Sequence, residues 1–183
     1  MSSNRLLGAA CALAIGLAAV AHADVMVGGS AMLPQKNIVQ NAVNSKDHTT
    51  LVAAVKAAGL VATLQGKGPF TVFAPVNAAF DALPAGTVDT LLKPENKATL
   101  TKVLTYHVVP GRLTAADLDR LIKQGHGTAE LTTASGGRLW LMKNGDRNIT
   151  IKDEAGAVAD ISIYDVMQSN GVIHSVDRML MPK

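Results

Sequence analysis

Between Asn37 and Gln124 the apolar residues recur mainly every three or four positions, which is the spacing of one helix face. The segments with this spacing are 38–43, 51–58, 60–64, 88–92, 100–107 and 118–122. Phe70–Ala74 is instead β-branched and aromatic, and Pro75 follows it, so we expect a short strand there. The first part of the chain therefore predicts short helices around one strand.

Two polar positions are expected to begin helices. Asn77 follows the strand, and its side chain can accept a hydrogen bond from the amide of Ala79 or Phe80. Thr114 and Asp117 have the spacing of a capping box, with Asp in place of the usual Glu. We expect a helix to start at each of these positions.

Beyond residue 127 the period of the apolar residues changes from 3.6 to two. The predicted strands are Thr128–Thr132, Arg138–Lys143, Asn148–Lys152, Val158–Tyr164 and Val172–Asp177. Short breaks such as Asn144-Gly145 and Asn170-Gly171 separate them, and Asn-Gly favours tight hairpins because both residues tolerate positive φ. Parallel crossovers need a dozen or more residues, so these neighbours should be antiparallel. Helices followed by a β-meander predict an α+β fold.

The first 23 residues have the pattern of a secretory signal peptide. Arg5 is the only charged residue before Asp24, residues 6–21 are uncharged and mainly apolar, and Ala21-His22-Ala23 provides small residues for cleavage. The apolar run is shorter than the roughly 20 residues that span a bilayer, so cleavage after Ala23 is favoured over a retained anchor. We expect a secreted or periplasmic protein that contacts a membrane only through this leader.

After the leader, one domain is expected. Residues 24–36 contain Gly28-Gly29-Ser30 and Pro34 and show no periodicity, which predicts a flexible lead-in. No linker or internal repeat divides residues 37–183, so they should form a single folded unit.

Composition excludes several kinds of functional site. Hydrophobic residues make up 48% of the chain and aromatic residues only 3%, so the core should be mainly aliphatic, with Phe73, Phe80 and Trp140 inside it. The single cysteine, Cys11, lies in the leader, which excludes disulfides, thiolate metal sites and a cysteine nucleophile from the mature chain. The formal net charge is +3 and the basic residues are dispersed, so no nucleic-acid footprint is visible.

No local catalytic or metal-binding motif is present, and we expect no catalytic, cofactor-binding or metal-binding residues. Nothing resembles a nucleophile elbow, a zinc helix or a phosphate-binding glycine loop. His48, His107, His126 and His174 lie too far apart in sequence for a local metal motif. A Ser/His/Asp site assembled by the fold stays open, because triads form from distant residues.

Three segments together resemble the signatures of the fasciclin domain family. They are Thr71–Phe80, Tyr106–Gly111 and Ser169–Pro182, and they occur in the family's order and spacing. The resemblance implies a twisted antiparallel β-wedge, or sandwich, packed with a layer of short helices. It also implies a non-enzymatic adhesion module outside the cell, which binds a surface or matrix protein or a polysaccharide.

The resemblance points to two candidate partner-binding pairs, each with a structural alternative. Tyr106 and His107 match a segment implicated in integrin recognition in animal relatives, but His107 also extends a helix face and can bind an orphan carbonyl. Asp165 and Val166 match an Asp-Ile type pair with the same association, yet they also fit a strand-end acid beside core aliphatics. The structural alternative is favoured for both pairs, and the oligomeric state is not predicted.

A second function hypothesis is a periplasmic carrier of a small apolar or lipid-like ligand. The ligand would lie between the helical layer and the wedge. A closed interior larger than about 300 Å³, the lower end for ligand pockets, would favour this hypothesis.

Overall fold

The computed structural model describes residues 25–146 and 148–183. The predicted signal peptide and its cleavage site therefore lie outside the described residues. Within them, no helix is both long enough and apolar enough to cross a bilayer.

The predicted α+β fold is confirmed. The helices are α1 (Ile38–Ala42), α2 (Thr49–Ala58), α3 (Val61–Leu64), α4 (Asn77–Asp81), α5 (Thr87–Leu92), α6 (Lys97–Tyr106) and α7 (Ala115–Gln124), with 3₁₀ turns η1 (Lys46–His48) and η2 (Pro94–Asn96). The strands are β1 (Val25–Val27), β2 (Ser30–Met32), β3 (Phe70–Pro75), β4 (Val108–Pro110), β5 (Thr128–Thr132), β6 (Arg138–Asn144), β7 (Asn148–Lys152), β8 (Val158–Gln168) and β9 (Gly171–Val176).

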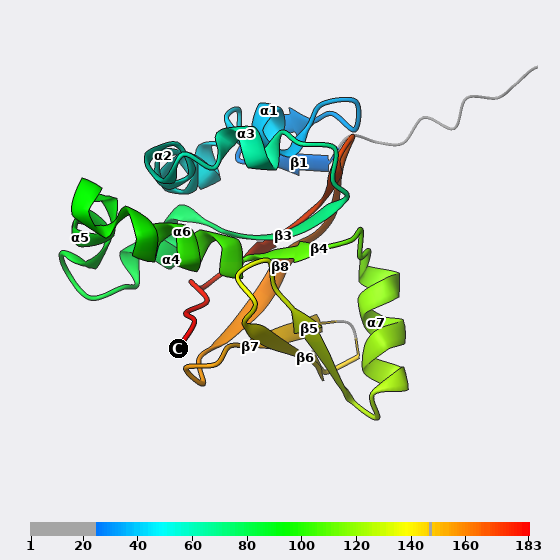
Figure 1. Cartoon of the computed structure of the whole chain (residues 1–183). Helices are drawn as coiled ribbons and strands as arrows, with labels where there is room; N and C mark the ends of the chain where they lie inside the picture. The colour runs from blue at the N-terminus through cyan, green and yellow to red at the C-terminus, as the bar shows by residue number, and fades with distance from the viewer. Residues whose placement is uncertain (1–24, 147) are drawn as a thin grey trace, which may run out of the picture.

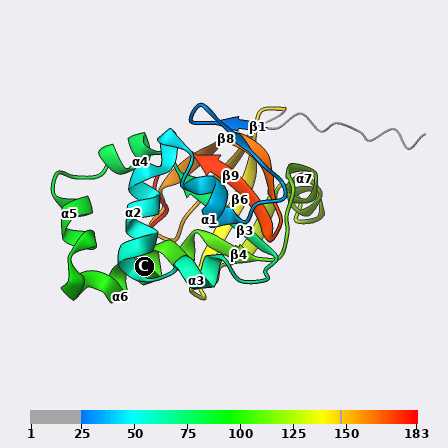
Figure 2. The same ribbon diagram turned by 90° about the horizontal axis from the view of Figure 1, so that it is seen from above.

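Seven strands form one mixed sheet in the order β4-β3-β9-β8-β7-β6-β5. Strands β5 to β9 form the predicted antiparallel meander. Strand β3 joins it by pairing in parallel with β9, from Phe70 opposite Gly171 to Pro75 opposite Val176. Strand β3, which comes first in the sequence of this sheet, and strand β9, the last described strand, thus lie side by side near the β4 edge (Figure 2).

Two hydrophobic clusters lie on opposite sides of this sheet. Helices α1, α2 and α3 cover one side of β3 and β9, and Figure 2 shows this helical layer from above. On the other side, strands β5 to β8, which we call the wedge, and helix α7 enclose a second cluster (Figure 1). Phe80 lies in the first cluster and Phe73 in the second. The prediction that both belong to the core is therefore confirmed.

The segment predicted to be a flexible lead-in contains an ordered hairpin. Strands β1 and β2 pair through a turn in which Gly28 and Gly29 have φ of 58° and 77°. Val27 and Met32 are buried in the first hydrophobic cluster. The prediction missed the hairpin because strands of three residues are too short to show a period.

Asn77 does not cap its own helix, contrary to the prediction. Val76 occupies the cap position of α4, and no side chain bonds there. The Asn77 carboxamide oxygen instead accepts hydrogen bonds from the Thr49 hydroxyl and the Thr50 amide, 3.2 and 3.1 Å away. Asn77 therefore stabilises the start of α2, which is distant in sequence. The capping box of Thr114 and Asp117 forms at α7 as predicted.

Candidate functional site

Tyr106, the last residue of α6, is fully buried in the second hydrophobic cluster. Its hydroxyl donates a hydrogen bond to the Arg138 carbonyl at 2.6 Å and accepts one from the Glu154 amide at 3.0 Å. Burial raises the pKa of Tyr106 to about 12, so the phenol stays protonated and can donate. The side chain ties the end of α6 to β6 and to the turn after β7, and it presents no surface to a partner.

His107 is also buried, with 2% of its surface exposed. Its Nδ1 donates to the Val103 carbonyl at 2.8 Å, and its Nε2 accepts from the Leu180 amide at 3.0 Å. Burial lowers the pKa of His107 to about 4, so the ring is neutral at physiological pH. A neutral imidazole has one donor and one acceptor, and both are used here. His107 thus joins α6 to the C-terminal segment.

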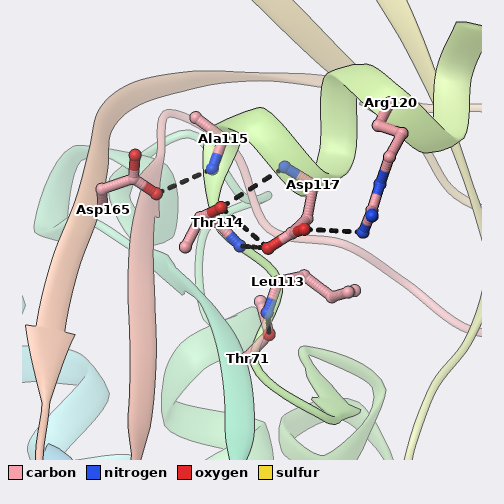
Figure 3. Close-up of polar contacts among 7 residues, drawn as sticks. All are labelled: Thr71, Leu113, Thr114, Ala115, Asp117, Arg120 and Asp165. Carbon is pink, nitrogen blue, oxygen red and sulfur yellow. Dashed lines mark hydrogen bonds and ion pairs between the residues drawn. The ribbon is translucent and has the colours of Figure 1, made fainter.

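Asp165 lies in an irregular part of β8 and has φ of 54°, a conformation that Asp tolerates better than most residues. Its carboxylate accepts a 2.7 Å hydrogen bond from the amide of Ala115, the first residue of α7 (Figure 3). A carboxylate is stabilising at a helix N-terminus, where free amides and the helix dipole favour negative charge. Asp165 is half-buried, and its carboxylate faces α7.

His174 reinforces the same junction from β9. Its Nδ1 accepts from the Asp165 amide at 3.2 Å, and its Nε2 donates to the Leu113 carbonyl at 2.8 Å. The Thr71 hydroxyl accepts from the Leu113 amide at 2.9 Å, so β3 also holds this segment (Figure 3). Val166, next to Asp165, is 1% exposed and packs in the first hydrophobic cluster. Of the four candidate residues, Asp165 is half-buried and the other three are buried.

Sequence reasoning placed Trp140 in the core, but it lies on the outside of the wedge. Its neighbours Leu139 and Leu141 are fully buried, so the alternation of a strand turns the side chain of Trp140 outward. The indole Nε1 donates a 3.1 Å hydrogen bond to the Glu130 carboxylate on β5, directly across the strand pair. The alternation Leu139-Trp140-Leu141 was the signal that could have placed this residue correctly.

Trp140 is the centre of a surface that we call the outer face. It consists of Glu130, Arg138, Trp140, Met142, Lys152 and Val158, contributed by β5, β6, β7 and β8. The Arg138 guanidinium pairs with Glu130 at 3.4 Å, so one carboxylate holds both the indole and the guanidinium. An open groove of about 520 Å³ adjoins Trp140 and Met142 and extends to Lys183. This surface combines aromatic and aliphatic groups with both signs of charge.

A cavity of about 100 Å³ lies between the helical layer and strands β3 and β9, at a different part of the sheet from the outer face. Its position is the one that the carrier hypothesis named, but its volume is below the roughly 300 Å³ that would favour enclosure of a whole ligand. The surface of the cavity is almost entirely apolar, and most of its lining residues are aliphatic.

Three buried polar side chains meet at this cavity. The Ser45 hydroxyl lies 2.9 Å from His48 Nδ1, and the Ser175 hydroxyl lies 3.4 Å from His48 Nε2. Burial lowers the pKa of His48. In a Ser-His-Asp site a carboxylate orients the histidine, whereas a second serine occupies that place here. Across residues 25–146 and 148–183, no carboxylate is hydrogen-bonded to a histidine ring, and no three His, Cys, Asp or Glu side chains are grouped to hold a metal.

Comparison with known proteins finds a matching family model and several similar sequences. The family model for the fasciclin domain matches residues 46–182. Protein sll1483 of Synechocystis is 43% identical over 180 residues, which cover 92% of this chain and 90% of that protein. The cell surface glycolipoprotein MPB83 of Mycobacterium bovis is 35% identical, with 85% of this chain and 64% of that protein covered.

Two further matches come from animals. The transforming growth factor-beta-induced protein ig-h3 of Sus scrofa is 36% identical over 132 residues, 72% of this chain but only 17% of that protein. In the solved structure of a FAS1 domain pair from the insect cell adhesion molecule Fasciclin I, the fold matches with a TM-score of 0.69 at 18% identity. That match covers 80% of this chain and 51% of the other. The family model alone spans most of this chain, and the chain therefore belongs to the fasciclin domain family.

Proposed function

We propose that this protein is an exported, non-enzymatic binding module that attaches to a protein partner at a cell surface or in a matrix. Fasciclin-type relatives named as a cell surface glycolipoprotein and a cell adhesion molecule support this proposal. The observation that carries it is the outer face around Trp140.

The residue types of the outer face are those of protein interfaces. Aromatic residues, Met and Arg are enriched in such interfaces, and Trp and Arg dominate the few positions that contribute most of the binding energy. Here Trp140, Met142 and Arg138 come together on adjacent positions of one strand face.

The outer face is also preorganised. Glu130 holds the Trp140 indole and the Arg138 guanidinium, and all three lie on paired strands rather than on loops. Side chains that are already fixed lose less conformational entropy when a partner binds, so more of the contact energy contributes to affinity.

The four positions singled out from the sequence have a supporting role in this proposal. Tyr106 and His107 join α6 to the wedge and to the C-terminal segment, and Asp165 and Val166 join β8 to α7 and to the helical layer. We infer that they maintain the arrangement of the strands that present the outer face. Changes at these positions would then weaken binding through the fold.

The test is attachment of the purified protein to intact cells of the producing organism. Trp140→Ala should lower attachment about thirtyfold or more, because truncating a central interface tryptophan typically costs about 2 kcal/mol or more. Val43→Ala is the matched control, since Val43 is 48% exposed and lies after α1, away from the outer face. Both variants should retain the wild-type melting temperature.

Protease treatment of the cells distinguishes the two partner classes. Loss of attachment supports a protein partner, whereas full attachment after protease treatment would indicate a polysaccharide and contradict the proposal. Equal attachment of wild type and Trp140→Ala would show that the outer face does not bind the partner.

Export has its own check. The intact mass of the protein isolated from outside the cytoplasm should correspond to a chain that begins at Asp24. A mass that includes residues 1–23 would show that the leader is retained.

A further inference from the structure

The helical layer leaves an unfilled space above the sheet. Protein interiors are close-packed and contain few voids larger than a water molecule, so a cavity of about 100 Å³ is a notable feature. Its lining includes Leu51, Val55, Val72, Val166 and Ile173, all of them buried and aliphatic. Water gains little in such a space because it finds too few polar partners, whereas an apolar group fits it.

The buried polar groups at the cavity are already satisfied. Ser45, His48 and Ser175 bond to one another, and no buried side-chain nitrogen or oxygen in the described residues lacks a hydrogen-bond partner. The interior therefore places no polar requirement on a ligand and favours the apolar end of one.

The cavity reaches the surface near the C-terminal end of α2. Lys56, in the last turn of α2, and Thr63, in α3, both line the cavity, and both are exposed. Among the described lining residues Lys56 is the one with a full charge at neutral pH, and no ion pair to it occurs in the described part of the chain.

A second ammonium group lies at the same end of α2. Gly59 ends this helix, and a β-carbon placed on Gly59 would be 3.4 Å from Lys97 Nζ. Lys56 and Lys97 thus both lie at the C-terminal end of α2, and Lys56 also lines the apolar cavity. This charge is complementary to a single negative group carried on an apolar chain.

We propose that this cavity binds a free fatty acid, with the end of its hydrocarbon chain inside and its carboxylate beside Lys56 and Lys97. The small volume means that only the terminal part of the chain is enclosed. The cavity is lined by none of the six residues of the outer face, so this proposal is independent of the proposed function.

Calorimetric titration with dodecanoate, below its micelle concentration, tests the proposal. We expect saturable binding of one molecule per chain. Lys56→Glu should weaken it two- to fivefold or more, the effect of losing one exposed ion pair. Lys67→Glu is the charge control, because Lys67 is exposed and does not line the cavity. Dodecyltrimethylammonium, with an equal chain and the opposite charge, should bind more weakly than dodecanoate.

A second pair of variants tests the cavity itself. Val52→Phe adds volume at a half-buried lining residue of α2 and should abolish binding. Val88→Phe makes the same change at a half-buried residue of α5 that does not line the cavity, and it should bind as wild type. Thermal melting checks that each variant folds. If Val52→Phe does not fold, the comparison of Lys56→Glu with Lys67→Glu tests the proposal in its place.

Several results would overturn the proposal. They are no binding of dodecanoate, equal or tighter binding of the cationic amphiphile, and unchanged binding by folded Val52→Phe. Binding only to phosphatidylglycerol vesicles, without binding of free dodecanoate, would show a membrane-surface interaction in its place.

Discussion

Protonation of His107 should lower the free energy of unfolding as the pH falls. The neutral ring donates from Nδ1 to the Val103 carbonyl and accepts at Nε2 from the Leu180 amide. The imidazolium form has two donors and no acceptor. The hydrogen on its Nε2 would therefore point at the hydrogen of the Leu180 amide, and the hydrogen bond between them would be lost. Because the ring is buried, water cannot replace the lost bond.

The size of this effect follows from the two pKa values of His107. Burial lowers its pKa from 6.5 to about 4 in the folded state, and each unit of difference corresponds to about 1.4 kcal/mol. The folded form therefore binds the proton less well than the unfolded form. The stabilisation is fully present above pH 6.5 and is lost progressively as the pH falls toward 4, up to about 3 kcal/mol in total.

The assay is urea unfolding of wild type and His107→Gln at several pH values between 7 and 4. Burial also lowers the pKa values of His48 and His174, and hydrogen bonds lower those of Asp117, Asp119 and Glu154, so all of these groups add acid sensitivity in both proteins. The difference between the two proteins isolates His107. Wild type should be the more stable at pH 7, and its advantage should shrink as the pH falls. A difference that does not change with pH would refute the reasoning.

Three further predictions concern stability at neutral pH. Tyr106→Phe should lower the free energy of unfolding by about 1–3 kcal/mol, because it leaves the buried partners of the hydroxyl unpaired; an unchanged urea midpoint would contradict this. Asp165→Ala should cost about 1 kcal/mol by removing the carboxylate at the start of α7, and amide exchange at Ala115 should accelerate; equal exchange rates would argue against this role. Met32→Ala should cost about 2–5 kcal/mol if the β1–β2 hairpin is part of the core, and a melting temperature equal to that of wild type would show that it is not.

Features that depend on neighbouring residues could be predicted from the sequence. The capping box of Thr114 and Asp117 joins residues three apart, and the strands β5 to β7 alternate within a few positions. Features that depend on distant partners could not. The parallel pairing of β3 with β9 and the bonds from Asn77 to Thr49 and Thr50 join segments whose contact no local pattern encodes.

The candidate site residues also differ in whether neighbouring or distant residues determine their surroundings. Motif matching selected Tyr106 and Asp165, but their hydrogen bonds reach Glu154 and Ala115, which are 48 and 50 residues away. Trp140 is a different case, because its alternation with Leu139 and Leu141 is local. The general preference of tryptophan for the interior predicts a buried side chain there, whereas the period of its own strand predicts an outward one, and the structure follows the period.

Photo-cross-linking tests the central claim, that the outer face meets the partner, most directly. A benzophenone amino acid placed at Lys152, opposite Trp140, would report on the outer face, and one at the exposed Lys93, after α5, would be the control. After attachment to cells, irradiation should cross-link the protein to surface protein from position 152 and not from position 93. Cross-links from position 93 alone, or attachment with none from position 152, would contradict the account.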